Sequence, residues 1–181
     1  MLITSPLPRT FYERDTHVVA KDLLGKLVIR ELNGKQIIGR ICEVESYVGE
    51  DDRACHAAKG RTRRTEVMYG EAGHAYVYMI YGMYFCLNVV TEGKDFPAAV
   101  LLRAVTPVEN ISEKTNGPGK LCRAFAIDRT LNTHDLTKKS ELIITHDGTR
   151  IDQHDIIATP RIGVAYAGED ALLPWRYLYS K

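Results

Sequence analysis

The chain has 181 residues, 45% of them hydrophobic, a size and composition that indicate one ordinary domain with a proper core. Its formal net charge is only +1, which is weak for a protein that neutralises many phosphates. No apolar run approaches the roughly 20 residues of a membrane helix, and the N-terminus lacks a signal-peptide pattern, so we expect a soluble, intracellular protein that does not bind membranes.

The N-terminal segment predicts a capped helix followed by a β-hairpin. Asp15 can cap a short helix that runs to Leu24. Two strand-like segments, 26–32 and 35–46, then flank Asn33-Gly34, which is a strong hairpin signal. Counted in steps of two, one face of the second strand carries Ile37, Ile41, Glu43, Glu45 and Tyr47.

A histidine and a basic loop follow this acidic strand. His56 comes eleven residues after Glu45, and the segment KGRTRR begins at Lys59. An acid on a strand, close to an aromatic ring and a histidine, has the composition of a site that activates water. Glu45 therefore becomes the candidate catalytic acid, although a random glutamate is more often a surface residue without a role.

Tyrosines are concentrated in a second predicted hairpin over residues 75–90. The segments AYVYMIY and YFCLNVV pair around Gly82, which places Tyr76 and Tyr78 on one face and Tyr81 at the tip. Buried phenols need hydrogen-bond partners, so a core strand seldom carries this many. Such a cluster of flat amphipathic rings favours a flat ligand, and a nucleobase is the obvious one.

The second half of the chain adds an arginine and a short helix. Arg103 lies in the apolar strand AAVLLRAV, where a guanidinium needs a carboxylate partner, and we expect Glu45 to provide it. Further on, Asn116 is the expected cap of a helix with Pro118 near its start. The free amides of that helix and Lys120 would suit a phosphate.

The sequence lacks the motifs of several common classes of enzyme and metal-binding protein. The four cysteines form no C-x-x-C pair and the histidines have no H-x-x-x-H spacing, so we expect no metal site. No G-x-S-x-G, P-loop or dinucleotide fingerprint is present. A glycosidase pair is excluded because Glu43 and Glu45, on one strand face, would not flank a bond from two sides.

Six segments of the chain closely resemble the alkyladenine (3-methyladenine) DNA glycosylase family. They are RICEVESY, ACH, YVYMIYGMYFCLNVV, AVLLRAVTP, NGPGKLCRAFAI and PRIGVAYAGE, and they occur in order from about Leu7 to Tyr177. Together with the predicted elements, this resemblance predicts an α+β fold: a single domain over residues 1–181, with a curved, mostly antiparallel, open-barrel-like sheet, surrounding helices and a protruding hairpin.

The resemblance implies a monofunctional enzyme of base excision repair. It would flip alkylated or deaminated purines, such as 3-methyladenine, 7-methylguanine, ethenoadenine and hypoxanthine, out of double-stranded DNA and hydrolyse the N-glycosidic bond. No metal or cofactor is implied, and we expect a monomer located in the cytoplasm or nucleoid of a bacterium or in the nucleus of a eukaryote.

The same resemblance assigns roles to individual residues. Glu45 would be the general base, while Arg103 and the carbonyl of Ile162 would complete the coordination of the attacking water. The implied walls of the base pocket are Tyr47, His56 and Tyr78, with Asn88 crowding the 2-amino group of guanine, and Tyr81 would intercalate into the duplex. The implied DNA contacts are Arg61, Thr62, Arg63, Arg64, Met83, Tyr84 and Lys120.

Two alternatives from another class stay open at this point. The chain could be a nucleic-acid-binding module without activity, or a silent relative that only senses damage. Glu45 discriminates between enzyme and binder, because a passive binder gains nothing from an acid beside bound phosphates. An excision assay on lesion-containing duplexes would separate these alternatives.

Overall fold

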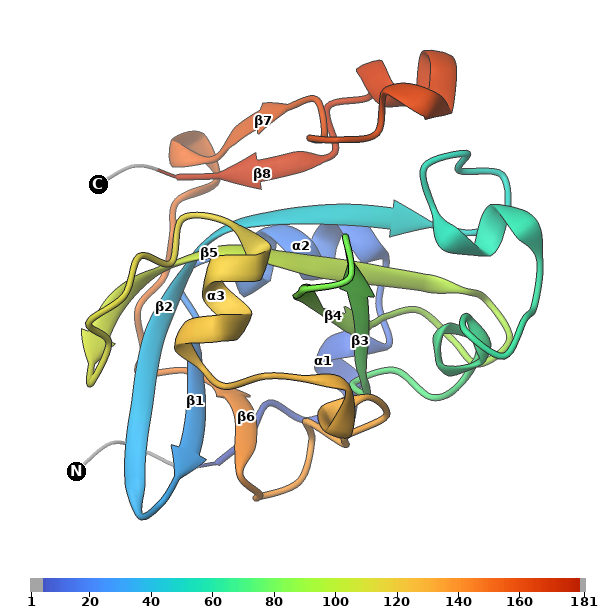
Figure 1. The fold of residues 1–181 in the computed structure, drawn as a ribbon. Helices are drawn as coiled ribbons and strands as arrows, with labels where there is room; N and C mark the ends of the chain where they lie inside the picture. The colour runs from blue at the N-terminus through green and yellow to red at the C-terminus, as the bar shows by residue number, and fades with distance from the viewer. Residues whose placement is uncertain (1–4, 180–181) are drawn as a thin grey trace.

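The strands of the computed structural model, which describes residues 5–179, join in one eight-stranded antiparallel sheet (Figure 1). The strands are β1 (Leu27–Leu32), β2 (Lys35–Val48), β3 (Ala75–Ile80), β4 (Tyr84–Val90), β5 (Ala98–Glu109), β6 (Leu142–Thr145), β7 (Ile157–Thr159) and β8 (Arg176–Leu178). Six of them follow the order β3-β4-β5-β2-β1-β6, while β8 pairs with both β2 and β7. The sheet curls into a half-barrel, which confirms the predicted α+β architecture.

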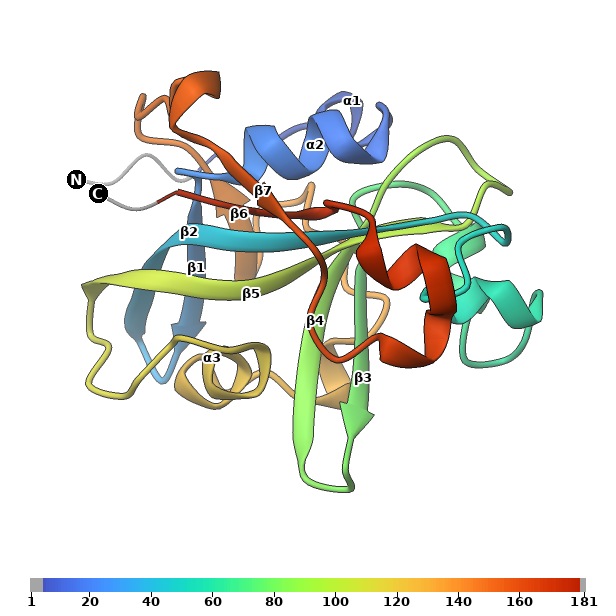
Figure 2. The same cartoon turned by 90° about the horizontal axis from the view of Figure 1, so that it is seen from above.

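Short helices cover the sheet on both sides. They are α1 (Arg9–Tyr12), α2 (Thr16–Leu23) and α3 (Pro118–Ala124), with the 3-10 segments η1 (His56–Lys59), η2 (Glu66–Tyr69), η3 (Arg129–Leu131), η4 (Gln153–Asp155) and η5 (Ala165–Leu172). Figure 2 shows α2 and α3 on opposite sides of the long pair β2 and β5. Both helices contribute to the main apolar core, through residues such as Leu23 and Leu121.

The capped helix and the first hairpin are confirmed. The side chain of Asp15 accepts a hydrogen bond from the amide of Val18 at 3.0 Å, so it caps α2. Asn33 and Gly34 both have positive φ angles, 51° and 73°, as a tight two-residue turn between β1 and β2 requires. No helix within residues 5–179 is long and apolar enough to cross a membrane.

The predicted face of β2 is wrong in its first half because the strand contains a bulge. Ile41 pairs with Val105 and Glu43 pairs with Ala104, which leaves Cys42 without a partner on β5. The extra residue shifts the alternation, so Ile41 packs in the main core together with Val44. Glu43 and Glu45 therefore do not share a face with Ile41, contrary to the simple count.

Beyond the bulge, the register of three neighbouring strands positions the site. Glu45 of β2 pairs with Leu101 of β5, and Leu101 pairs on its other side with Asn88 of β4. On its free side the same stretch of β2 pairs with β8, where Glu45 lies opposite Arg176. Strands on both sides explain why the side chain of Glu45 is completely buried.

The second hairpin, β3 and β4, protrudes from the body of the protein (Figure 2). Its last pair is Ile80 with Tyr84, so Tyr81, Gly82 and Met83 form the turn. Tyr81 has a φ of 51° and its side chain is 86% exposed, which confirms its predicted place at the tip.

The predicted cap of α3 is wrong. The N-cap residue is Gly117, which offers no side chain, and Pro118 occupies the start of the helix. The amide oxygen of Asn116 instead accepts a hydrogen bond from Lys120 Nζ at 3.1 Å. Asn116 thus holds Lys120 near the helix start without capping the helix itself.

Candidate active site

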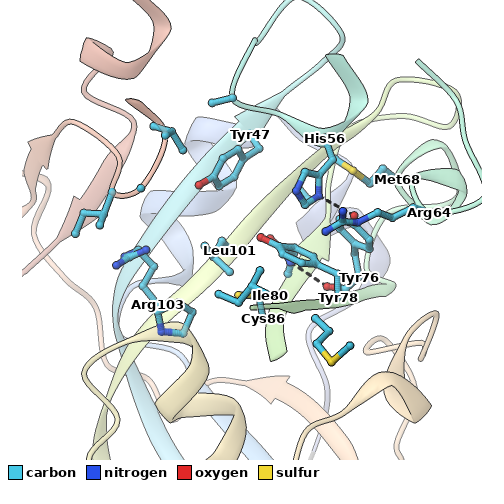
Figure 3. A pocket seen from close by; sticks show the side chains of 18 of the residues that line it. Tyr47, His56, Arg64, Met68, Tyr76, Tyr78, Ile80, Cys86, Leu101 and Arg103 are labelled. Carbon is cyan, nitrogen blue, oxygen red and sulfur yellow. Dashed lines mark hydrogen bonds between the residues drawn. The ribbon is translucent and has the colours of Figure 1, made fainter. Parts of the chain in front are cut away.

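A cavity of about 410 Å³ opens between the protruding hairpin, β5 and the segment after β7 (Figure 3). Its size falls within the range of small-molecule sites. The structure brings most of the predicted site residues together at its surface. The predicted residues that line it are Tyr47, His56, Arg64, Tyr78, Tyr81, Asn88, Arg103 and Ile162.

Glu45 lies directly behind the cavity wall. Its Oε2 accepts a hydrogen bond from the Tyr47 hydroxyl at 2.7 Å, and its Oε1 accepts one from the amide of Ile162 at 2.8 Å. Arg103 Nη1 is 3.4 Å from Oε1. These three neighbours all line the cavity, whereas Glu45 itself is closed off from it. The predicted contact of Glu45 with Tyr47 is confirmed.

The arginine beneath the cavity has two carboxylate partners. Arg103 forms the predicted ion pair with Glu45, but its closer partner is Glu43, whose Oε1 accepts from Arg103 Nε at 2.8 Å. Arg176 Nη1 also donates to Glu43 Oε1, at 2.9 Å. Burial alone would raise the pKa of Glu43, but the hydrogen bonds from Arg176 and Arg103 hold it below its usual value. Glu43 is therefore an anchor for the two arginines.

Both carboxylate oxygens of Glu45 accept hydrogen bonds from neutral donors, and the Arg103 guanidinium lies farther away, at 3.4 Å. Burial and the charge of Glu45 raise the pKa of Tyr47, so its phenol stays protonated and can only donate to the carboxylate. Each carboxylate oxygen accepts one hydrogen bond of normal geometry, which leaves acceptor capacity on both. The arrangement suits a carboxylate that must take up a proton from a bound water.

One wall of the cavity is made of aromatic rings that meet edge to face or at a tilt. His56 Nδ1 is 2.8 Å from the Tyr76 hydroxyl, and the ring of His56 meets that of Tyr78 at 4.6 Å and 72° (Figure 3). Burial, assisted by the charges of Arg64 and Lys59, lowers the pKa of His56 to about 4. The imidazole is therefore neutral near pH 7 and adds no positive charge to the wall.

The structure adds Tyr76 to the predicted site. Burial raises the pKa of Tyr76 to about 12, so its hydroxyl remains a donor or acceptor beside His56. Its backbone carbonyl accepts a hydrogen bond from Asn88 Nδ2 at 3.0 Å, which fixes the orientation of the buried amide. The signal for Tyr76 was already present in the sequence, since it shares a strand face with Tyr78.

Two tyrosine rings of the pocket already carry a guanidinium on one face. The guanidinium of Arg161 lies 4.8 Å from the centre of the Tyr47 ring, and that of Arg64 lies 5.1 Å from the centre of Tyr78. Arg161 was not predicted as a functional residue, although it directly precedes Ile162 in the sequence. A cationic base would therefore gain less from these rings than from free ones.

The basic loop contains both paired and unpaired cations. Arg61 is bound to Glu66 through two hydrogen bonds of 2.7 and 2.9 Å and lies 3.2 Å from Asp95. In contrast, Arg63 and Arg64 of this loop, and Lys120 of α3, form no ion pair within the part of the chain that the structure describes. Thr62 lies at the turn of this loop, where its amide donates to Thr65 Oγ1 at 2.8 Å.

The four cysteines are free thiols, three of them buried and Cys42 half-buried. Cys86 lines the cavity, and burial raises its pKa to about 11. Within residues 5–179, no group of three or more His, Cys, Asp or Glu side chains is placed to hold a metal ion.

Comparison with known proteins assigns the chain to a family. The model of the methylpurine-DNA glycosylase (MPG) family matches residues 10–181. A protein of Methanocella arvoryzae named "Putative 3-methyladenine DNA glycosylase" is 52% identical over 97% of this chain and 92% of its own length. Proteins with the same name from Legionella pneumophila and Myxococcus xanthus are 53% and 49% identical, over 92% and 94% of this chain and 91% and 88% of their own lengths. The chain therefore belongs to the methylpurine-DNA glycosylase family of DNA repair enzymes.

Proposed function

We propose that this enzyme binds double-stranded DNA, flips a damaged purine into the 410 Å³ cavity and hydrolyses its N-glycosidic bond with a water activated by Glu45. One observation carries the proposal. A fully buried carboxylate, held by the Tyr47 hydroxyl and the Ile162 amide, lies directly behind a cavity walled by aromatic rings. Such a cavity suits a flat base, and a carboxylate directly behind its wall supports the proposed role in proton transfer.

In the proposed reaction, water attacks the anomeric carbon of the damaged nucleotide. The bond from water oxygen to that carbon forms as the bond from carbon to the purine nitrogen breaks, and the purine leaves with the electron pair. The proton of the water passes to Glu45. Arg103 and the backbone carbonyl of Ile162 are the proposed further partners of this water. The water would reach Glu45 from the cavity by passing between Tyr47, Arg103 and Ile162, which separate the carboxylate from the cavity.

The walls of the cavity would select the base. Tyr47 and Tyr78 offer rings for stacking, and neutral His56 offers a ring nitrogen for hydrogen bonding. Asn88 is the proposed residue that crowds the 2-amino group of undamaged guanine, since its amide is fixed on the Tyr76 carbonyl. The proposed substrates are 3-methyladenine, 7-methylguanine, ethenoadenine and hypoxanthine. Because a guanidinium already lies over each of the two tyrosine rings, cation–π attraction to a charged base is weakened, and the pocket would select these bases mainly by shape and hydrogen bonding.

The rim of the cavity would hold the DNA. Tyr81 is the proposed wedge that fills the gap left by the extruded nucleotide, with Met83 and Tyr84 beside it on the same hairpin. Arg63, Arg64 and Lys120 would contact phosphates, while Arg61 and Thr62 would keep the loop in shape through their bonds to Glu66 and Thr65.

The test is the Glu45→Gln variant on duplexes that each contain one of the four lesions. Gln keeps the volume of the side chain but cannot take up a proton, so we expect base release to fall at least a thousandfold while affinity for the lesion duplex is kept. The matched control is Glu141→Gln, which alters a carboxylate paired with Arg30 at the β1–β6 edge of the sheet. Full activity of Glu45→Gln would refute the proposed base, and a wild type that binds lesions without releasing them would support the damage-sensing alternative.

A further inference from the structure

Asp52 and Arg161 form an ion pair whose two side chains are both completely buried. Arg161 Nη1 and Nη2 donate to the two oxygens of Asp52 at 2.6 and 2.8 Å. The desolvation of two charges cancels much of their attraction, so a buried pair is a weak source of stability compared with apolar residues of the same volume. Stability alone therefore does not explain this pair.

Arg161 packs against one hydrogen-bond donor of Glu45 and directly precedes the other in the chain. Its guanidinium lies 4.8 Å from the centre of the Tyr47 ring and 4.9 Å from that of Trp175. Its Nη1 also donates, at 2.9 Å, to the carbonyl of Ser46, the residue between Glu45 and Tyr47. The next residue along the chain is Ile162, whose amide donates to Glu45. The side chain of Arg161 thus packs on one group that holds the carboxylate, and its backbone leads directly into the other.

Asp52 extends this connection to the wall of the base pocket. Its Oδ2 accepts from the amide of Val48, at the end of β2, and its Oδ1 accepts from the amide of Ala54, at 3.1 and 3.0 Å. Ala54 lines the cavity and lies two residues before His56. The pair therefore links the end of β2, the segment before His56 and the segment that carries Ile162.

We propose that the Asp52–Arg161 pair is a positioning element of the glycosylase site, which aims the Tyr47 hydroxyl and the Ile162 amide at Glu45. This inference rests on the proposed function of Glu45. Hydrogen bonds to a carboxylate favour its ionised form, so a loosened pair would leave a poorer base at low pH. The other titratable or charged groups around Glu45 are Tyr47, Glu43, Cys86, Arg103 and Arg176.

The test is Arg161→Lys. This change keeps a cation opposite Asp52 but removes the bidentate hydrogen bond and the planar guanidinium that packs on the Tyr47 ring. We expect single-turnover excision to slow at least tenfold near pH 7, with the acid limb of the rate profile moved to higher pH and the rate partly recovered in alkaline buffer. Affinity for undamaged duplex should stay within twofold of the wild type. General destabilisation of the fold would lower the rate without moving the acid limb of the pH profile.

The matched control is Arg40→Lys. Arg40 also makes a two-pronged contact with an aspartate, Asp147, at 3.2 and 2.7 Å, and donates to a backbone carbonyl, that of Gly25, but it touches no residue of the site. We expect this variant to keep the excision rate and pH profile of the wild type. Equal profiles for Arg161→Lys and Arg40→Lys would overturn the positioning role.

If Arg161→Lys does not fold, the double variant Asp52→Asn with Arg161→Gln replaces it, because it leaves no unpaired buried charge. The same slowing and the same shift of the acid limb are expected, and a wild-type profile would again overturn the inference. Wild type and Glu45→Gln are measured on the same duplexes. If the wild type excises the base and Glu45→Gln does not, the proposed function stands whatever the result for Arg161→Lys. An inactive wild type would overturn both the proposed function and the positioning role of the Asp52–Arg161 pair.

Discussion

The floor and the rim of the cavity are built in opposite ways. At the floor, Glu45, Tyr47 and Arg103 lie on the long strands β2 and β5, buried or nearly so and held by hydrogen bonds or ion pairs. At the rim, Tyr81 is 86% exposed on a hairpin tip, and Arg63 has no ion-pair partner within the described residues. Bond hydrolysis requires fixed geometry, whereas docking onto a deformable duplex requires groups that are free to engage it. Changes at the floor should therefore alter the rate of excision, and changes at the rim should alter binding and extrusion.

The largest effect in this comparison is expected at the floor for Tyr47→Phe. The change keeps the ring over Arg161 but removes the hydroxyl that donates to Glu45 Oε2, so a buried carboxylate oxygen loses its partner at a cost of about 1–3 kcal/mol. We expect single-turnover excision to fall tenfold or more while affinity for a lesion duplex changes little. Rates at saturating enzyme and a binding titration measure the two quantities separately. An unchanged rate would show that the hydroxyl does not support the base.

At the rim, Tyr81→Ala should act on extrusion alone. Flipping costs a few kcal/mol, least for a lesion that is already poorly paired, so the variant should lose more activity on hypoxanthine in a stable duplex than on the same lesion in a destabilised one. Because the side chain is 86% exposed, the free energy of unfolding should change by less than about 0.5 kcal/mol. The measurement pairs a thermal melt with excision from both duplexes. An unstable protein with equal losses on both would show that Tyr81 is a packing residue.

Local signals in the sequence predict turns and helix caps better than they predict the floor of the cavity. The turn at Asn33-Gly34, the cap at Asp15 and the exposed tip at Tyr81 all depend on a few adjacent residues, and all three predictions are confirmed. Glu45 and Tyr47 were placed together because they are two residues apart on one strand. That count succeeds only because both lie beyond the bulge at Cys42, and it fails for Ile41, which lies before it.

The remaining features of the floor depend on contacts between distant residues. Arg161 lies 109 residues from Asp52, so no local pattern indicates their pairing. Arg103 was expected to pair with Glu45, yet its closer contact is with Glu43, because the irregular register around the bulge brings that carboxylate to its Nε. Likewise, Asn116 has the side chain of a helix cap, but Gly117 takes that position and Asn116 bonds Lys120. Tertiary geometry decided each of these outcomes.

His56 belongs to the wall between floor and rim, and its burial predicts a pH-dependent stability. Its pKa is about 4 in the folded protein against an ordinary 6.5, so between these values the unfolded chain binds a proton that the folded chain does not. The stability that depends on neutral His56 is fully present above pH 6.5 and decreases as the pH falls towards 4. In His56→Gln, we expect the deficit in unfolding free energy relative to the wild type to shrink from pH 7 to pH 4.5. Urea denaturation at several pH values measures this, and a constant deficit would contradict it.

The smallest effect separates two arginines of the basic loop, Arg63 and Arg61. Each phosphate contact contributes roughly 0.9 to the negative slope of log affinity against log salt. Arg63→Gln should reduce the magnitude of that slope by about this amount on undamaged duplex, because its cation has no carboxylate partner within the described residues. Arg61→Gln should leave the slope nearly unchanged, because the charge of Arg61 is already engaged by Glu66 and Asp95. Titrations of both variants across a range of salt concentrations give the two slopes under identical conditions. If both variants reduce the slope equally, Arg61 exchanges its carboxylate partners for phosphates when DNA binds. The distinction between a paired Arg61 and an unpaired Arg63 then does not hold in the complex with DNA.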